Sequence, residues 1–201
     1  KLTIVLWLVL QIPFLTEDLP GSLSYSRGPY SDEGLNTFAV RNFINSGFQE
    51  ISESDNFIKS PVLNAYLFAP FAIFQNDLLV GRIGMLLLVA LLFWQIVERI
   101  KYGWLIVLLF SGTPILFHFS RLMMGDLSSV LIPLVAIVIY QNWIKTNRQV
   151  SYRKLVLLIL LASLSVGMKI QGVAVYGIFL LSVFAIPVPG LSRAKRATAL
   201  F

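Results

Sequence analysis

Residues 78–97 read LLVGRIGMLLLVALLFWQIV and contain one charged side chain, Arg82, near the first end. A helix needs roughly 20 mostly apolar residues to cross the hydrocarbon core of a bilayer. This stretch has that length and that composition. It therefore predicts a membrane-spanning helix and makes the bilayer the solvent in which the rest of the chain is interpreted.

The composition of the whole chain agrees with this interpretation. Of its 201 residues, 57% are hydrophobic and only 13% are charged, which is more apolar than an ordinary soluble domain. The absence of cysteine excludes disulfides and thiolate metal sites. The net charge of +6 comes from basic residues beside apolar segments, which indicates membrane orientation. No Gly-rich phosphate loop or basic-aromatic stripe is present, so nucleic acid is not an expected partner.

Five further segments are predicted to span the membrane: 2–15, 102–120, 127–144, 155–168 and 170–188. The first is short, as expected of a truncated span, and a signal-peptide core is its alternative explanation. The chain begins with Lys1 and stops just after a basic run, so we expect a fragment of a longer polytopic protein. The predicted fold is all-α, a single transmembrane helical domain covering residues 1–201 with amphipathic juxtamembrane helices in its first exterior loop.

Charge decides how residues 61–75 are placed. The segment is apolar but contains Pro61, Asn64, Pro70 and Gln75, which make it a poor span. If it does not cross, ten of the sixteen Lys and Arg residues share one face with a single acid, Glu98. If it crosses, two basic loops move to the exterior, against the positive-inside rule. We therefore predict an interfacial or re-entrant segment over 61–75 and six spans with both ends cytoplasmic.

The first exterior loop, residues 16–60, is too long for a simple connection. Within it, apolar residues recur at helical spacing and predict a helix over 32–46 lying on the membrane surface. Ser31 is a candidate N-cap and Ser46-Gly47 a candidate stop, which places Asp32 and Glu33 in the first turn. The apolar face is formed by Leu35, Phe38, Ala39, Val40, Phe43 and Ile44.

This threading places eight chemically useful side chains at the exterior face: Asp32, Glu33, Lys59, Arg82, His118, Arg121, Asp126 and Lys169. Acids and bases at one rim of a helical bundle are costly unless they have a function. A carboxylate can act as general base toward a hydroxyl nucleophile. Guanidinium and ammonium groups can bind a phosphate and stabilise the charge that grows on it. Beside a lipid-facing groove, this set suits a transferase with a lipid-linked phosphate donor.

Each of these residues also has a purely structural explanation. First-turn acids such as Asp32 and Glu33 complement the helix dipole by ~0.3–1 kcal/mol. Asp126 could cap the helix that comes after it or pair with Arg121, and Lys169 could extend toward the headgroups. His118 alone is typical of a hydrogen-bonded interface residue. No metal ligand is predicted, because one His with scattered carboxylates is compatible with a divalent ion without requiring one.

Short motifs in order along the chain resemble those of the type C, polyprenyl-phosphate-sugar-dependent glycosyltransferases. The nearest branch is the protein O-mannosyltransferase and aminoarabinose-transferase group. The stretch 29–34, PYSDEG, followed by FAVRN at 38–42, resembles the family's Asp-Glu motif and surface helix. The remaining matches are KSPV at 59–62, VGRI at 80–83, SRLMMGD at 120–126 and GMK at 167–169. The chain departs from the family pattern in two places. Ser60 stands where the family usually has proline, and Gln171 comes two residues after Lys169.

The resemblance implies an inverting transfer of a sugar from an undecaprenyl- or dolichyl-type phosphate on the non-cytoplasmic face. It implies that Asp32 deprotonates the acceptor hydroxyl and that Glu33 orients it. Asp126 would position a sugar hydroxyl, the acceptor or an Arg partner. The residues expected to bind the donor phosphate are Lys59, Arg121 and Lys169. Arg82 is a secondary candidate for the phosphate, and His118 is a secondary candidate for contact with the substrate.

The expected partners are the polyprenyl-phosphate-sugar donor, the bilayer, and a lipid, glycan or protein hydroxyl as acceptor. The expected location is the bacterial inner membrane, as a multi-pass protein with its active site outside. A non-enzymatic transporter or permease is the alternative, although transport paths usually place charges near mid-bilayer. A structural membrane subunit is a third interpretation, in which Asp32 and Asp126 have no need to approach one another.

Overall fold

The computed structural model describes residues 1–16, 31–47, 60–75, 77–146, 149–187 and 189–199, and every regular element in these ranges is a helix. The predicted all-α class is therefore confirmed for the described residues. The elements are α1 (Leu2–Gln11), η1 (Ile12–Phe14), α2 (Ser31–Ser46), α4 (Pro61–Phe74), α5 (Leu78–Arg99), α6 (Gly103–Gly112), α7 (Pro114–Phe119), α8 (Asp126–Lys145), α9 (Tyr152–Met168), α10 (Gly172–Ala185) and α11 (Arg193–Thr198).

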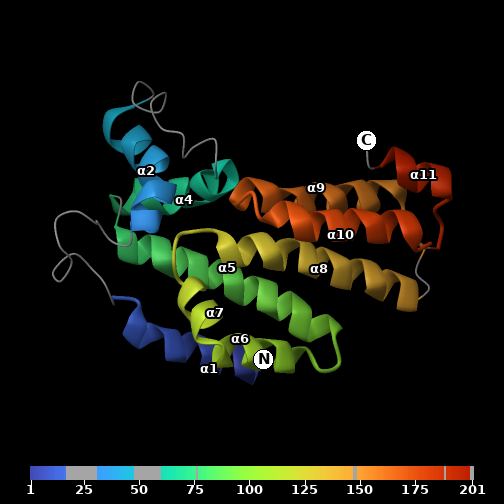
Figure 1. Ribbon diagram of the computed structural model, residues 1–201, viewed down its shortest axis with the longest axis horizontal. Coiled ribbons are helices and arrows are strands. Elements are labelled where there is room, and N and C mark those ends of the chain that lie inside the picture. The colour runs from blue at the N-terminus through green and yellow to red at the C-terminus, as the bar shows by residue number, and fades with distance from the viewer. Residues whose placement is uncertain (17–30, 48–59, 76, 147–148, 188, 200–201) are drawn as a thin grey trace.

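The long helices lie side by side, and α8 packs against α5, α9 and α10 (Figure 1). Helices α1 and α6 contact each other and α5 along one flank of this bundle. At one end, α2 lies on α4, which in turn contacts α5 and α9. The same end receives the start of α5, the start of α8 and the end of α9.

In the part of the chain that the structure describes, two helices, α5 and α8, are long and apolar enough to cross a membrane. Helix α5 begins at a carboxylate cap, because Asp77 Oδ1 accepts a hydrogen bond of 2.8 Å from the backbone N–H of Leu79. Helix α8 begins directly after Gly125, whose φ of +73° lies in the left-handed region. Its Pro133 lies inside the helix, yet α8 continues to Lys145. The predicted spans 78–97 and 127–144 both fall inside these helices.

The segment predicted as one span over 102–120 is two helices, α6 and α7, separated at Thr113. Pro114 is the first residue of α7, where its missing N–H is tolerated but where it cannot continue the hydrogen bonding of α6. The predicted span 102–120 is therefore interrupted at Thr113 rather than continuous in its helical hydrogen bonding. Within residues 61–75, α4 covers Pro61–Phe74 with Pro61 at its first position, and Gln75 caps its C-terminal end with a φ of +56°.

Three apolar clusters hold the helices together. The largest joins α1, α5, α6 and α8 and includes the edge-to-face pair Trp7 and Phe93, whose ring centroids are 5.2 Å apart. A second joins α8, α9 and α10 around Tyr140, which donates to the Ile186 carbonyl at 2.7 Å. The third packs α2 and α4 against Met123 and Met168. This third cluster fixes the end of the molecule where the predicted site residues gather.

The outward faces of the helices also carry large apolar side chains. Leu2, Leu109 and Leu181 are 71%, 69% and 69% exposed, and they belong to three different helices. Further exposed apolar residues follow one face of α9: Leu157, Leu160, Leu161 and Leu164. A water-soluble monomer rarely leaves apolar patches of this extent uncovered.

Candidate functional site

The segment between α7 and α8 is buried although it is not helical. Residues Ser120 to Met124 are each at most 4% exposed, and Gly125 is buried with them. A buried loop is unusual because its backbone polar groups need partners inside the protein. One partner comes from α2, since the Met123 N–H donates to Glu33 Oε1 at 3.0 Å.

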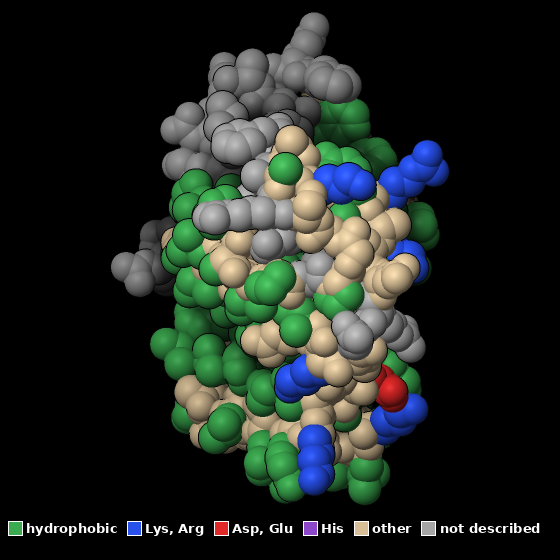
Figure 2. Space-filling model, turned by 90° about the vertical axis from the view of Figure 1, so that its right-hand side faces the viewer, with side chains coloured by type: hydrophobic (Ala, Val, Ile, Leu, Met, Phe, Trp, Pro, Cys, Tyr) green, Lys and Arg blue, Asp and Glu red, His purple; other side chains and the backbone are tan. Residues whose placement is uncertain are grey.

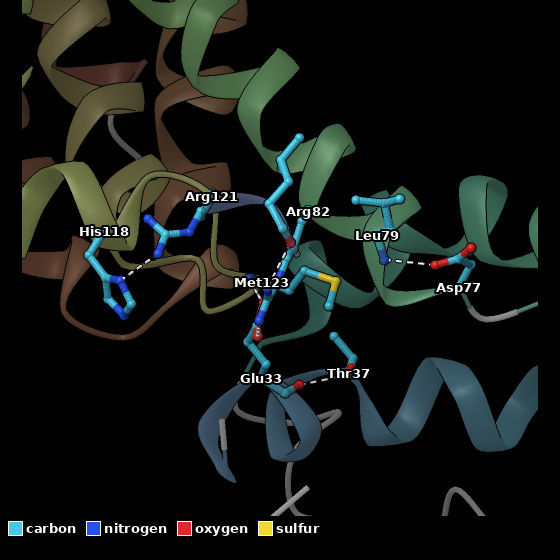
Figure 3. Close-up of polar contacts among 9 residues, drawn as sticks. Glu33, Thr37, Asp77, Leu79, Arg82, His118, Arg121 and Met123 are labelled. Carbon is cyan, nitrogen blue, oxygen red and sulfur yellow. Dashed lines mark hydrogen bonds and ion pairs between the residues drawn. The ribbon is translucent and has the colours of Figure 1, made fainter. Parts of the chain in front are cut away.

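Glu33 and Arg82 form a fully buried ion pair at the centre of this end (Figure 3). Arg82 Nε donates to Glu33 Oε1 at 3.1 Å and Nη2 donates to Oε2 at 2.6 Å, a two-point contact. Arg82 Nη1 also donates to the Leu15 carbonyl at 2.9 Å. Neither side chain has exposed surface, so the pair ties α2, α5, the end of η1 and the buried segment together.

Helix α2 is held by further buried polar contacts. Thr37 Oγ1 donates to the Glu33 carbonyl at 2.7 Å. The Val40 N–H donates to Asn64 Oδ1 at 3.2 Å, and Asn64 Nδ2 donates to the Ser60 carbonyl at 3.0 Å. The helix predicted over 32–46 is observed over Ser31–Ser46, and its buried residues Ala39 and Val40 lie against protein. Gly47, which belongs to the predicted stop Ser46-Gly47, has a φ of +81° and directly follows the helix.

Asp126 and Lys169 form the second ion pair of this end, with Lys169 Nζ 2.7 Å from Asp126 Oδ2. Their side chains are 31% and 19% exposed, so unlike Glu33 and Arg82 they reach the surface. Asp126 is the first residue of α8 and makes no side-chain cap. The N-cap position considered for Asp126 is therefore held by Gly125, and the described partner of the Asp126 carboxylate is Lys169.

The glycine before Asp126 explains how the pair forms. A Cβ at Gly125 would lie 2.7 Å from the Met168 carbonyl oxygen, so only glycine allows this approach. Lys169 follows Met168 in extended conformation at the end of α9, and the chain enters α10 at Gly172. The contact between Gly125 and Met168 thus brings the start of α8 to the turn that carries Lys169.

His118 and Arg121 are neighbours on the same segment, with Arg121 Nη2 2.9 Å from His118 Nδ1 (Figure 3). Arg121 is 2% exposed, and its guanidinium carbon lies 5.5 Å from the centroid of the Phe14 ring. Both residues are therefore bound into the protein through neighbouring side chains.

Gln11 is a polar residue of this region that the sequence motifs did not identify. It is fully buried, and its Nε2 donates to the Phe117 carbonyl at 2.9 Å and to Ser120 Oγ at 2.7 Å. These bonds attach α1 to the residue preceding Arg121. The signal that could have found it was a lone amide in the otherwise apolar run Leu2–Gln11.

Six of the eight predicted site residues are thus brought to one end: Glu33, Arg82, His118, Arg121, Asp126 and Lys169. The Asp32 backbone lies in the first turn of α2, and its side chain lies outside the described residues, as does the whole of Lys59. Most of the predicted exterior loop 16–60 also falls outside them. The predicted basic face is the opposite end, where Figure 2 shows Lys and Arg side chains.

Within the described ranges, no group of three or more His, Cys, Asp or Glu residues could hold a metal ion. Among the residues that the structure describes, this end offers a partly exposed carboxylate–ammonium pair beside a buried, tightly bonded segment.

The chain matches no known family model, curated protein or solved structure. The similarity to type C glycosyltransferases consequently stays a prediction from the motifs, and the function that it implies is a proposal.

Proposed function

We propose that this chain is a membrane glycosyltransferase that moves a sugar, with inversion, from a polyprenyl-phosphate donor to an acceptor hydroxyl. The observation that carries the proposal is the Asp126–Lys169 pair, which is partly exposed at the end where the other predicted site residues gather. An ammonium group has three donors, and its bond to Asp126 uses one of them. The others suit oxygens of a donor phosphate.

The proposed setting is the bacterial inner membrane, crossed several times, with this end outside. The exposed apolar side chains on α1, α6, α9 and α10 support burial in lipid. Helix α5 extends over 22 residues, about 33 Å at 1.5 Å per residue, which matches a hydrocarbon core of roughly 30 Å. Lys and Arg at the opposite end suit a cytoplasmic face.

The contacts suggest a division of roles within the site. Glu33 and Arg82 saturate one another in a fully buried pair, so we assign them to positioning α2 rather than to direct contact with substrate. Arg121 and His118 hold the buried segment in the same way. Lys169, with Lys59, is assigned to the donor phosphate and Asp126 to a sugar or acceptor hydroxyl. Asp32, next to the anchored Glu33, is assigned as the general base.

The experiment that tests this function compares sugar transfer by wild type, Asp32→Asn and Asp77→Asn in membranes supplied with labelled polyprenyl-phosphate sugars. Asp77 is a matched control, because it is an exposed carboxylate near the same end whose capping role asparagine can fulfil. We expect Asp32→Asn to lower turnover by about 10²–10⁴-fold, the usual contribution of a general base. We expect Asp77→Asn to leave turnover unchanged at equal expression.

Wild-type turnover in Asp32→Asn would remove Asp32 as the base while leaving the enzyme class in place. Absence of transfer by wild type from every donor class would favour the transporter or the structural subunit. The clustering of the charges at one end favours the enzyme, since a conduit usually carries its charges near mid-bilayer.

A further inference from the structure

An apolar groove of about 370 Å³ runs between α5, α8 and α9, away from the site described above. The residues that line it include Leu92, Val135 and Ala162, which are buried. Leu91 and Leu161 also line it and are 57% and 49% exposed. The groove therefore opens sideways, toward the region that lipid would occupy in the proposed membrane setting.

A polar pocket of about 500 Å³ adjoins the groove at the basic end of the bundle. It is lined by Lys1, Trp94, Gln95, Glu98, Arg99 and Asn142. Gln95 lines both the pocket and the groove, so the two lie next to each other at that residue.

Helical spacing places the groove and the pocket along the same helix faces. On α5, Leu88, Leu92, Gln95 and Arg99 recur every three or four residues and so share one face. On α8, the face with Ile139 continues into Asn142 one turn later. Each face is apolar toward the middle of its helix and becomes polar toward the basic end. From Leu88 to Arg99 the rise is about 16 Å, close to the thickness of one leaflet, about 15 Å.

The charges in the pocket leave it suited to one anion. Lys1 Nζ lies 2.8 Å from Glu98 Oε1, so this acid is compensated, and Lys1 also lies 4.6 Å from the Trp94 ring centroid. Arg99 uses one guanidinium donor in its 3.1 Å bond to the Gln95 carbonyl. A guanidinium has five donors and binds phosphate well. Figure 2 shows further Lys and Arg side chains on this face. By the helix bounds, Lys101 follows α5, Lys145 ends α8, and Arg153 and Lys154 lie in the first turn of α9.

We propose that this pocket and groove bind one anionic phospholipid, with its phosphate on Arg99 and an acyl chain between α5, α8 and α9. An apolar chain attached to a phosphate matches the change from apolar to basic along the two helix faces. The cytoplasmic leaflet supplies such lipids, and basic side chains at its surface attract them. This site is separate from sugar transfer, and its occupant need not be a substrate.

The test is native mass spectrometry of the delipidated protein titrated with phosphatidylglycerol or phosphatidylcholine. We expect one tightly bound phosphatidylglycerol per chain and weaker phosphatidylcholine binding. Arg99→Gln removes a charge-assisted contact and should weaken phosphatidylglycerol binding by about tenfold or more. Lys145→Gln, a matched change on the same end outside the pocket lining, should change it less than about twofold. Glycerol phosphate at equal concentration should not compete, because it has no chain for the groove.

A second variant, Ala136→Leu, tests the groove by placing a larger side chain on its floor, with helix content checked by circular dichroism. It should reduce lipid binding without changing oligomeric state. Equal losses in Arg99→Gln and Lys145→Gln would overturn the proposal, because they would indicate diffuse charge attraction. Competition by glycerol phosphate would show that the pocket binds the phosphate alone and that the groove contributes nothing, which would also overturn the proposal. If Ala136→Leu converted a dimer into a monomer, the groove would be the contact surface for a second copy of the chain and not a lipid site.

Discussion

Glu33 accepts hydrogen bonds from Arg82 and from the Met123 backbone while having no exposed surface. A buried carboxylate in this setting is stable only as long as its partners remain, since each charge compensates the other. The same residue is adjacent in sequence to Asp32, the proposed base. The pair therefore links the stability of this end to the position of the residue that we propose as the base.

Removing one partner of this pair should destabilise the protein strongly. We expect Glu33→Leu or Arg82→Met to lower the free energy of unfolding by about 3–5 kcal/mol, because each leaves a buried charge uncompensated. The double variant should lose less than the sum of the two, by about 0.5–3 kcal/mol. Denaturant titration in mixed micelles measures all three. Strict additivity would show that the two side chains do not stabilise each other.

At the scale of the elements, the buried segment between α7 and α8 depends on close backbone approach. Gly125 combines a φ of +73° with contact to the Met168 carbonyl, whereas Gly47 has a φ of +81° with nothing within 4 Å of its Cβ position. Substitution of Gly47 therefore measures the free-energy cost of a left-handed backbone alone, whereas substitution of Gly125 adds the cost of a steric clash.

We expect Gly47→Ala to cost about 1–2 kcal/mol, the usual penalty for an L-residue in the left-handed region. Gly125→Ala should cost a further ~1–3 kcal/mol from overpacking and should also shift Lys169 away from Asp126. Unfolding midpoints of the two variants check the difference. Equal midpoints would mean that the α8 start does not need its contact with the end of α9.

Much of the element pattern could be predicted from apolar runs and caps. Residues 78–97 and 32–46 are helical because their composition and end signals agree with the packing. The break at Thr113 was missed because hydrophobicity alone does not register a helix restart at Pro114. The partners of the site residues were missed for a different reason. Glu33 and Arg82 are 49 residues apart, and Asp126 and Lys169 are 43 apart, so only tertiary packing pairs them.

At the scale of the whole molecule, the proposed topology requires α5 and α8 to cross the bilayer with the Asp126 end outside. The chain contains no cysteine, so single cysteines can be introduced without background. Asp77 and Lys145 are exposed and lie at opposite ends of the two helices.

We expect Asp77→Cys to react with a membrane-impermeant maleimide in intact cells, and Lys145→Cys to react only after permeabilisation. Reversed labelling would place the site in the cytoplasm. Labelling of both from outside would show that the helices between them do not separate two compartments.

The measurement that tests the central claim most directly is sugar transfer by proteoliposomes containing wild type or the Asp126→Asn/Lys169→Met double variant. Replacing both members avoids leaving either charge unpaired, so we expect the variant to fold, and gel filtration checks this. We expect transfer from a polyprenyl-phosphate donor by wild type, and a loss of at least about tenfold in the variant for one missing phosphate contact. Undiminished transfer by a folded double variant would contradict the assignment of this pair to the site.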